Sequence, residues 1–169
     1  MKKYWRILFS LLLIAVLSAS TGCSLLGQKK KTFPHTFRQD RQNVAKIEIC
    51  TYEHEYGGGK REPLVELSES EMDEIWSDIS SLECHKFVLL DPILSYGDII
   101  IAITYLDGEV EMLGIHNIGR ISADGDLDTT GYRFEIDDIC GVITKYVDSN
   151  ILEENSEFFK QRNHRGQFD

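Results

Sequence analysis

A run of isoleucines followed by Asp-Gly restricts most strongly what this chain can fold into. Isoleucine stands at positions 99, 100, 101 and 103, so residues 98–106 would have two apolar faces if they were extended. A strand that is apolar on both faces belongs in the middle of a sheet. Asp107-Gly108 follows at once as a two-residue hairpin signal, and residues 109–116 supply the returning strand. We therefore expect an antiparallel sheet built around this hairpin.

Two segments have the periodicity of amphipathic helices. Ser68 and Glu71 have the spacing of a capping box, and an apolar stripe begins at Met72, so we expect a helix over residues 69–82. A second stripe runs from Ile136 to Val147 and predicts a helix that ends near Ser149, with two aspartates in its first turn, where the helix dipole favours negative charge.

The remaining segments complete an α+β fold. Further extended segments are expected at residues 44–52, 63–67 and 87–90, and at 118–122 and 127–134, which form a hairpin around Asp124-Gly125. The expected architecture is an antiparallel sheet of about five strands with two amphipathic helices on one face. It forms a single domain over residues 44–149.

Charge divides the chain and limits its partners. Residues 44–149 carry 7 basic and 23 acidic residues, whereas residues 24–43 carry 5 basic residues and one acidic residue. A net charge of −10 for the whole chain argues against nucleic-acid binding, which needs a basic surface. The domain would instead attract a cationic peptide. Residues 23–43 are expected to be a basic, flexible tether, and residues 150–169 a polar C-terminal tail. Docking of Phe158 and Phe159 onto the domain is the alternative to a frayed tail.

The first 22 residues have the layout of a secretory signal peptide. Lys2, Lys3 and Arg6 precede an apolar run over residues 7–17, which is too short for an ordinary membrane span, and small residues follow it. Ser20-Thr21-Gly22-Cys23 resembles the lipobox of bacterial lipoproteins, although Ser20 stands where that family usually has leucine. The resemblance implies cleavage before Cys23, lipidation of its thiol, and a location at the outer face of the cell membrane. A plain secretory signal and an uncleaved anchor reaching about residue 26 remain alternatives.

Three cysteines remain after the lipobox, at positions 50, 84 and 140. An odd number cannot all pair within one chain, and Cys140 lies on the apolar stripe of the second helix. A bridge between Cys50 and Cys84 is one alternative, and three free thiols are the other. A redox function would require two of these thiols within bonding distance.

Few other side chains indicate chemistry. Asp124, Asp126 and Asp128 alternate as calcium ligands do, but an EF-hand loop needs glycine where Thr129 stands, so a solvated turn is the simpler interpretation. Tyr52 and Tyr56 precede the glycines at 57–59 and are candidate contact residues. No cofactor is indicated, and no nucleophile motif such as Gly-x-Ser-x-Gly is present in the sequence.

The domain also resembles small uncharacterised domains of secreted Gram-positive proteins, through Tyr96-Gly97, the hairpin over residues 105–111 and the last helix. That resemblance implies no activity. We expect a membrane-anchored binding or accessory module, whose partner could be another envelope protein. The alternative is an envelope enzyme, hydrolase-like, with an unrecognised active site.

Overall fold

The computed structural model describes residues 31–53, 60–86 and 99–165. The chain divides into two units, residues 1–31 and 32–169, and nearly all described residues belong to the second. Cys23, Tyr56, the glycines at 57–59, the segment 87–90 and Tyr96-Gly97 lie outside the described residues.

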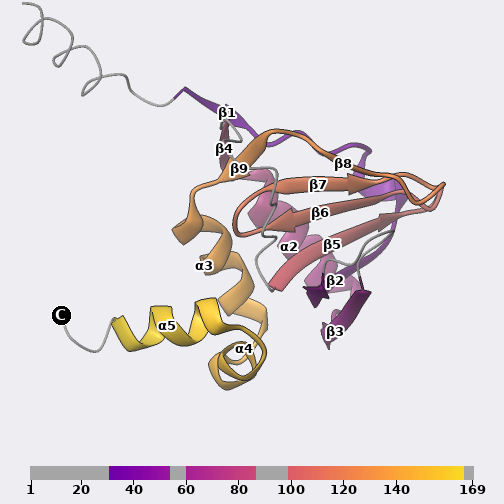
Figure 1. Ribbon diagram of the computed structural model, residues 1–169. Helices are drawn as coiled ribbons and strands as arrows, with labels where there is room; N and C mark the ends of the chain where they lie inside the picture. Colours follow the sequence, from indigo (N-terminus) through magenta and orange to yellow (C-terminus); the bar gives the residue numbers. More distant parts are fainter. Residues whose placement is uncertain (1–30, 54–59, 87–98, 166–169) are drawn as a thin grey trace, which may run out of the picture. The chain divides into compact units, whose positions relative to one another are not determined.

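A six-stranded antiparallel sheet forms the centre of the described part of the chain (Figure 1). In spatial order its strands are β3 (Lys60–Glu66), β2 (Val44–Glu53), β5 (Ile99–Tyr105), β6 (Val110–Gly114), β7 (Ile118–Ile121) and β8 (Leu127–Thr129). The isoleucine strand β5 has the central position that the sequence predicts, and its neighbours are β2 and β6. Ile99, Ile101 and Ile103 face one core cluster, whereas Ile100 and Ala102 belong to a second cluster on the opposite face.

The turn between β5 and β6 is one residue longer than predicted. Leu106, Asp107 and Gly108 form a three-residue loop, in which the Tyr105 N–H donates to the Glu109 carbonyl (2.9 Å) and the Gly108 N–H donates to the Tyr105 carbonyl (3.0 Å). Gly108 has φ = +87°, which a residue with a side chain rarely adopts. The extra residue pairs Ile103 with Glu111, whereas a two-residue turn would have placed residue 112 opposite Ile103.

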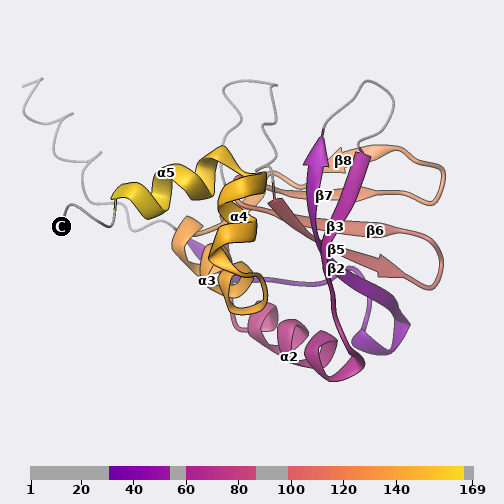
Figure 2. The ribbon, with the colours of Figure 1, turned by 90° about the horizontal axis from the view of Figure 1, so that it is seen from below.

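Two amphipathic helices cover one face of this sheet, as the sequence predicts. They are α2 (Glu69–Ser80) and α3 (Ile136–Tyr146). Figure 1 shows α2 behind the strands, and the turned view of Figure 2 shows it at the bottom of the picture. The N–H and hydroxyl groups of Ser68 bond the Glu71 carboxylate at 2.7 and 2.6 Å, which closes the predicted capping arrangement and lowers the Glu71 pKa. Ile75 of α2 and Ile143 of α3 share a fully buried cluster with the inward residues of β2, β5 and β6.

A second, three-stranded sheet differs from the prediction. It contains β1 (Thr32–Pro34), β4 (Glu83–Lys86) and β9 (Tyr132–Phe134), in the order β1-β4-β9. The expected continuous strand over residues 127–134 is wrong, because Gly131 (φ = +68°) turns the chain from β8 into β9. Phe134 is fully buried and joins this sheet to the main core.

The expected tether ends earlier than predicted, because residues 32–43 are folded. After β1 the chain continues to a short 3-10 helix, η1 (Arg41–Asn43). Phe37 stacks on Trp76 of α2, with ring centroids 3.6 Å apart and planes 16° apart. The prediction of a tether rested on the cations of this segment, whereas the aromatic side chain of Phe37 anchors it to the domain.

Residues 149–165 form helices α4 (Ser149–Asn155) and α5 (Glu157–Arg165), and Phe158 and Phe159 pack on the core, as the alternative to a frayed tail predicted. Each short helix buries one apolar side chain completely, Leu152 in α4 and Phe159 in α5. One or two apolar residues per helix are too few to produce a recognisable period. Within the described part of the chain, no helix is long and apolar enough to cross a bilayer.

Candidate functional site

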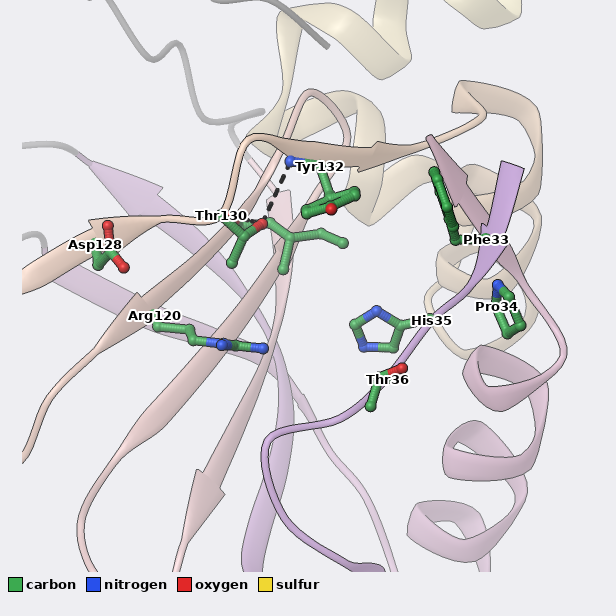
Figure 3. A pocket seen from close by; sticks show the side chains of 9 residues that line it. Phe33, Pro34, His35, Thr36, Arg120, Asp128, Thr130 and Tyr132 are labelled. Carbon is green, nitrogen blue, oxygen red and sulfur yellow. Dashed lines mark hydrogen bonds between the residues drawn. The ribbon is translucent and has the colours of Figure 1, made fainter. Parts of the chain in front are cut away.

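A cavity of about 520 Å³ opens between β1 and the edge of the large sheet formed by β7 and β8 (Figure 3). Its size lies in the range of small-molecule sites. Its lining combines aromatic, hydroxyl and charged side chains: Phe33, Pro34, His35, Thr36, Ile118, Arg120, Asp128, Thr130 and Tyr132.

The pairing of strands brings three charged residues into one row. Glu111 on β6 pairs with Arg120 on β7, and Arg120 pairs with Asp128 on β8. Directly paired residues project from the same face of a sheet, so this row lies on the face that the helices cover. Glu111 is enclosed behind the cavity, Arg120 lines its wall, and Asp128 is exposed in its lining.

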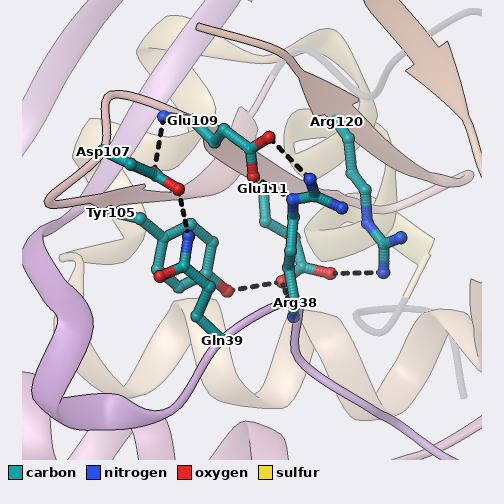
Figure 4. A network of polar contacts seen from close by, with 7 residues as sticks. All are labelled: Arg38, Gln39, Tyr105, Asp107, Glu109, Glu111 and Arg120. Carbon is teal, nitrogen blue, oxygen red and sulfur yellow. Dashed lines mark hydrogen bonds and ion pairs between the residues drawn. The ribbon is translucent and has the colours of Figure 1, made fainter.

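The Glu111 carboxylate is fully buried and surrounded by donors (Figure 4). Its Oε2 accepts hydrogen bonds from the Tyr105 hydroxyl (2.8 Å) and from the Arg38 backbone N–H (3.2 Å). Its Oε1 lies 3.5 Å from Nη2 of Arg120. Burial and the adjacent Glu111 carboxylate both raise the pKa of Tyr105. The Tyr105 hydroxyl therefore stays protonated and donates its hydrogen bond to the Glu111 carboxylate.

His35 lies between aromatic rings at the inner wall of the cavity. Its ring centroid is 4.7 Å from that of Phe37 and 5.1 Å from that of Phe134, both edge to face. Its Nε2 is 3.8 Å from Oε1 of Glu111, too far for a hydrogen bond. Burial lowers the His35 pKa, which the Glu111 charge opposes only in part, so the imidazole is neutral at pH 7.

Two buried polar atoms of this cavity have no hydrogen-bond partner, Nε2 of His35 and Nε of Arg120. Figure 3 shows the guanidinium and the imidazole pointing toward one another across the cavity. Leaving a buried polar atom unpaired costs about 1–3 kcal/mol, so such atoms normally have a partner. A bound molecule or water in this cavity would supply the missing partner.

The three aspartates predicted as a weak calcium site do not converge. Asp124 and Asp126 are exposed in the turn between β7 and β8, where the Asp126 N–H donates to the hydroxyl of Ser122 (3.1 Å). Asp128 lies on β8 and lines the cavity instead. Within residues 31–53, 60–86 and 99–165, no three His, Cys, Asp or Glu side chains gather as metal ligands.

Tyr52 is not the exposed contact residue that the sequence indicated. Its side chain is 5% exposed and packs with Cys50, Ile100 and Met112 on the sheet face opposite the helices. The position beside a glycine run indicated exposure, but Tyr52 is in phase with Cys50 on β2, and the second core cluster buries both side chains.

The cysteines at 50, 84 and 140 are buried and free. Cys50 lies in the cluster on one face of the large sheet, whereas Cys84 and Cys140 lie in the cluster on the other face, so the bridge between Cys50 and Cys84 does not form. Burial raises the pKa of Cys50 to about 12 and that of Cys140 to about 11. The reactive thiolate is therefore disfavoured at both positions.

Sequence reasoning missed His35, Glu111 and Arg120. One signal was available: Glu111 is in phase with Leu113, and both residues face the core. A glutamate in phase with core residues needs buried donors, and His35 and Arg120 are the polar neighbours that the fold supplies.

Comparisons with protein-family models, with curated proteins and with solved structures give no match.

Proposed function

We propose that this protein is a lipoprotein of the cell envelope that works as a binding module, and that its ligand occupies the cavity between β1 and the β7–β8 edge. The observation that supports binding is the pair of buried atoms without partners, Nε2 of His35 and Nε of Arg120. A cavity that presents unpaired polar atoms beside aromatic rings has the chemistry of a recognition site.

The anchor in this proposal is Cys23, through the resemblance of residues 20–23 to a lipobox. The folded unit begins at Thr32, nine residues later. Such an anchor would hold the chain at the outer face of the membrane. The ligand would then be a molecule of the envelope or one that reaches its outer face.

The enzyme alternative has less support in the described residues. The Glu111 carboxylate is enclosed and does not line the cavity, so only Asp128 offers a carboxylate to a bound molecule there. The buried cysteines at 50 and 140 hold raised pKa values and lack the thiolate character of a nucleophile.

The anchor is tested by metabolic labelling with an alkynyl fatty acid. We expect label on the full chain in the membrane fraction, and its loss in Cys23→Ala or under globomycin. Unchanged processing and membrane retention in both cases would contradict the lipid anchor.

Binding is tested by adding fractions of an envelope extract to the full-length chain and following its amide spectrum. The expected result is that one fraction shifts amides around residues 33–36 and 118–132, and that Thr36→Trp, which fills the cavity, abolishes the shift. If no fraction shifts these amides, the binding function of this cavity is wrong.

A further inference from the structure

We infer that the cavity recognises a neutral, hydroxyl-rich ring, that is, a sugar residue. This inference rests on the proposed binding function and names the ligand class for the same site. It follows from what each polar group of the cavity can donate or accept.

Two side chains of the lining have a single hydrogen-bonding role, because Arg120 can only donate and the Asp128 carboxylate can only accept. Nε of Arg120 is buried and unpartnered, and it can only donate. The Asp128 carboxylate is exposed in the same lining, and an ionised carboxylate can only accept. A simple anion has nothing to donate to Asp128, and a simple cation has nothing with which to accept from Arg120. A hydroxyl group both donates and accepts.

His35 adds a requirement that a hydroxyl also meets. In a neutral imidazole one ring nitrogen donates and the other accepts, and Nε2 of His35 lacks a partner. A hydroxyl can accept from Nε2 or donate to it, so it satisfies either tautomer. The threonine hydroxyls of the lining, at positions 36 and 130, likewise pair with groups of both kinds.

The buried Glu111 disfavours a zwitterion such as an amino acid. Such a ligand would place its carboxylate beside Arg120, whose Nη2 is only 3.5 Å from the Glu111 carboxylate. The guanidinium charge is thus already balanced by Glu111, whose own negative charge would repel a second carboxylate. A neutral ligand avoids this repulsion.

Aromatic side chains provide the apolar part of the site. The rings of Phe33 and Tyr132 lie edge to face, with centroids 6.2 Å apart, and both line the cavity. The C–H groups of a sugar ring can pack against such aromatic surfaces while its hydroxyls reach Arg120 and Asp128. The volume of about 520 Å³ leaves room for a sugar ring together with water.

The test uses the full-length lipidated chain in amine-oxide micelles, because sugar-headed detergents would compete. Glucose, N-acetylglucosamine, glycine and acetate are titrated separately while the amide spectrum is recorded. We expect a sugar to shift the amides of Thr36, Arg120 and Tyr132, with a Kd on the order of 1 mM. Asp128→Asn should weaken this binding about tenfold, because the amide replaces an acceptor oxygen by a donor.

The matched control is Asp126→Asn, which makes the same change in the exposed turn and should leave the sugar Kd unchanged. Equal sugar affinity in Asp128→Asn and the native chain would overturn the inference. So would cavity shifts with glycine or acetate but not with either sugar, although the binding function would then stand. Silence with all four probes overturns the sugar assignment, and the envelope-extract titration decides separately whether the cavity binds at all.

Discussion

Replacing Glu111 by glutamine tests how the buried carboxylate holds the cavity wall in place. The side chain keeps its shape but loses its charge. Two hydrogen bonds, from the Tyr105 hydroxyl (2.8 Å) and the Arg38 N–H (3.2 Å), change from charge-assisted to neutral. The guanidinium of Arg120 also loses its counter-charge at 3.5 Å.

The magnitude follows from these contacts. A hydrogen bond to a charged group contributes about 1.5–3 kcal/mol and a neutral one about 1 kcal/mol, so weakening two of them costs roughly 2 kcal/mol. The Arg120 side chain is 35% exposed, so water screens its unpaired charge and this loss adds little. We expect Glu111→Gln to lower the free energy of unfolding by about 2 kcal/mol and the midpoint of thermal unfolding by roughly 6–10 °C.

Urea and thermal unfolding of the full-length chain measure this change. The control is Glu109→Gln, which neutralises a carboxylate two residues away on the same hairpin that pairs with Arg38 near the surface. Its effect should be much smaller, because exposed ion pairs contribute little. Equal unfolding midpoints for the two variants would refute the argument that Glu111 stabilises the fold through Tyr105 and the Arg38 N–H.

Three further predictions concern the interior. Because burial lowers the pKa of His35 in the folded chain, the unfolded chain takes up a proton at this histidine at a higher pH, and the free energy of unfolding should fall as the pH drops through 6.5. A proton NMR titration that finds the folded His35 ring charged at pH 6.5 would contradict this. Phe159→Ala, at a position 1% exposed, should lower the free energy of unfolding by about 3–5 kcal/mol in urea titrations. The control Ile151→Ala, at a position 39% exposed, should lower it far less, and similar losses in the two variants would contradict the packing of α5 on the core. Cys50 and Cys140 should resist alkylation at pH 8 in the native chain and should react fully, without reductant, after denaturation. Rapid alkylation of either thiol in the native chain would disprove its burial.

The sequence predicted the hairpin but not the register that creates the site. Asp107-Gly108 marks a turn, and both a two-residue and a three-residue loop can contain it. The observed loop includes Leu106 and pairs Ile103 with Glu111, which turns Glu111 toward the helices. A one-residue shift would have turned it to the opposite face. The residues of the turn do not decide between the two loops, so they could not predict that the Glu111 carboxylate is buried on the helix-covered face.

The helices show what periodicity can and cannot supply. The stripes beginning at Met72 and Ile136 predicted α2 and α3 and where each begins, because each stripe spans three turns, although both helices end two or three residues earlier than predicted. Neither α4 nor α5 has such a stripe, and each is held by one buried side chain, Leu152 or Phe159. Their packing depends on a core surface that only the completed fold provides.

The same reason explains why the cavity was missed. His35 follows a three-residue strand in a segment dominated by cations, whereas Arg120 comes 85 positions later on β7. Only the pairing of β1 with β4, of β4 with β9 and of β6 with β7 brings these side chains to one cavity. Contacts of such long range leave no pattern in a single sequence.

The most direct test of the central claim, that this cavity binds a ligand in the envelope, is photo-crosslinking in intact cells. A compact aliphatic amino acid that carries a diazirine, much smaller than the tryptophan that fills the cavity, replaces Thr36 in the cavity lining, and in a control chain it replaces Ser81, which is exposed at the end of α2. The account predicts a discrete adduct from position 36 that weakens when Asp128→Asn is added, and no such adduct from position 81. Absence of an adduct at position 36, or the same adducts from both positions, would contradict it.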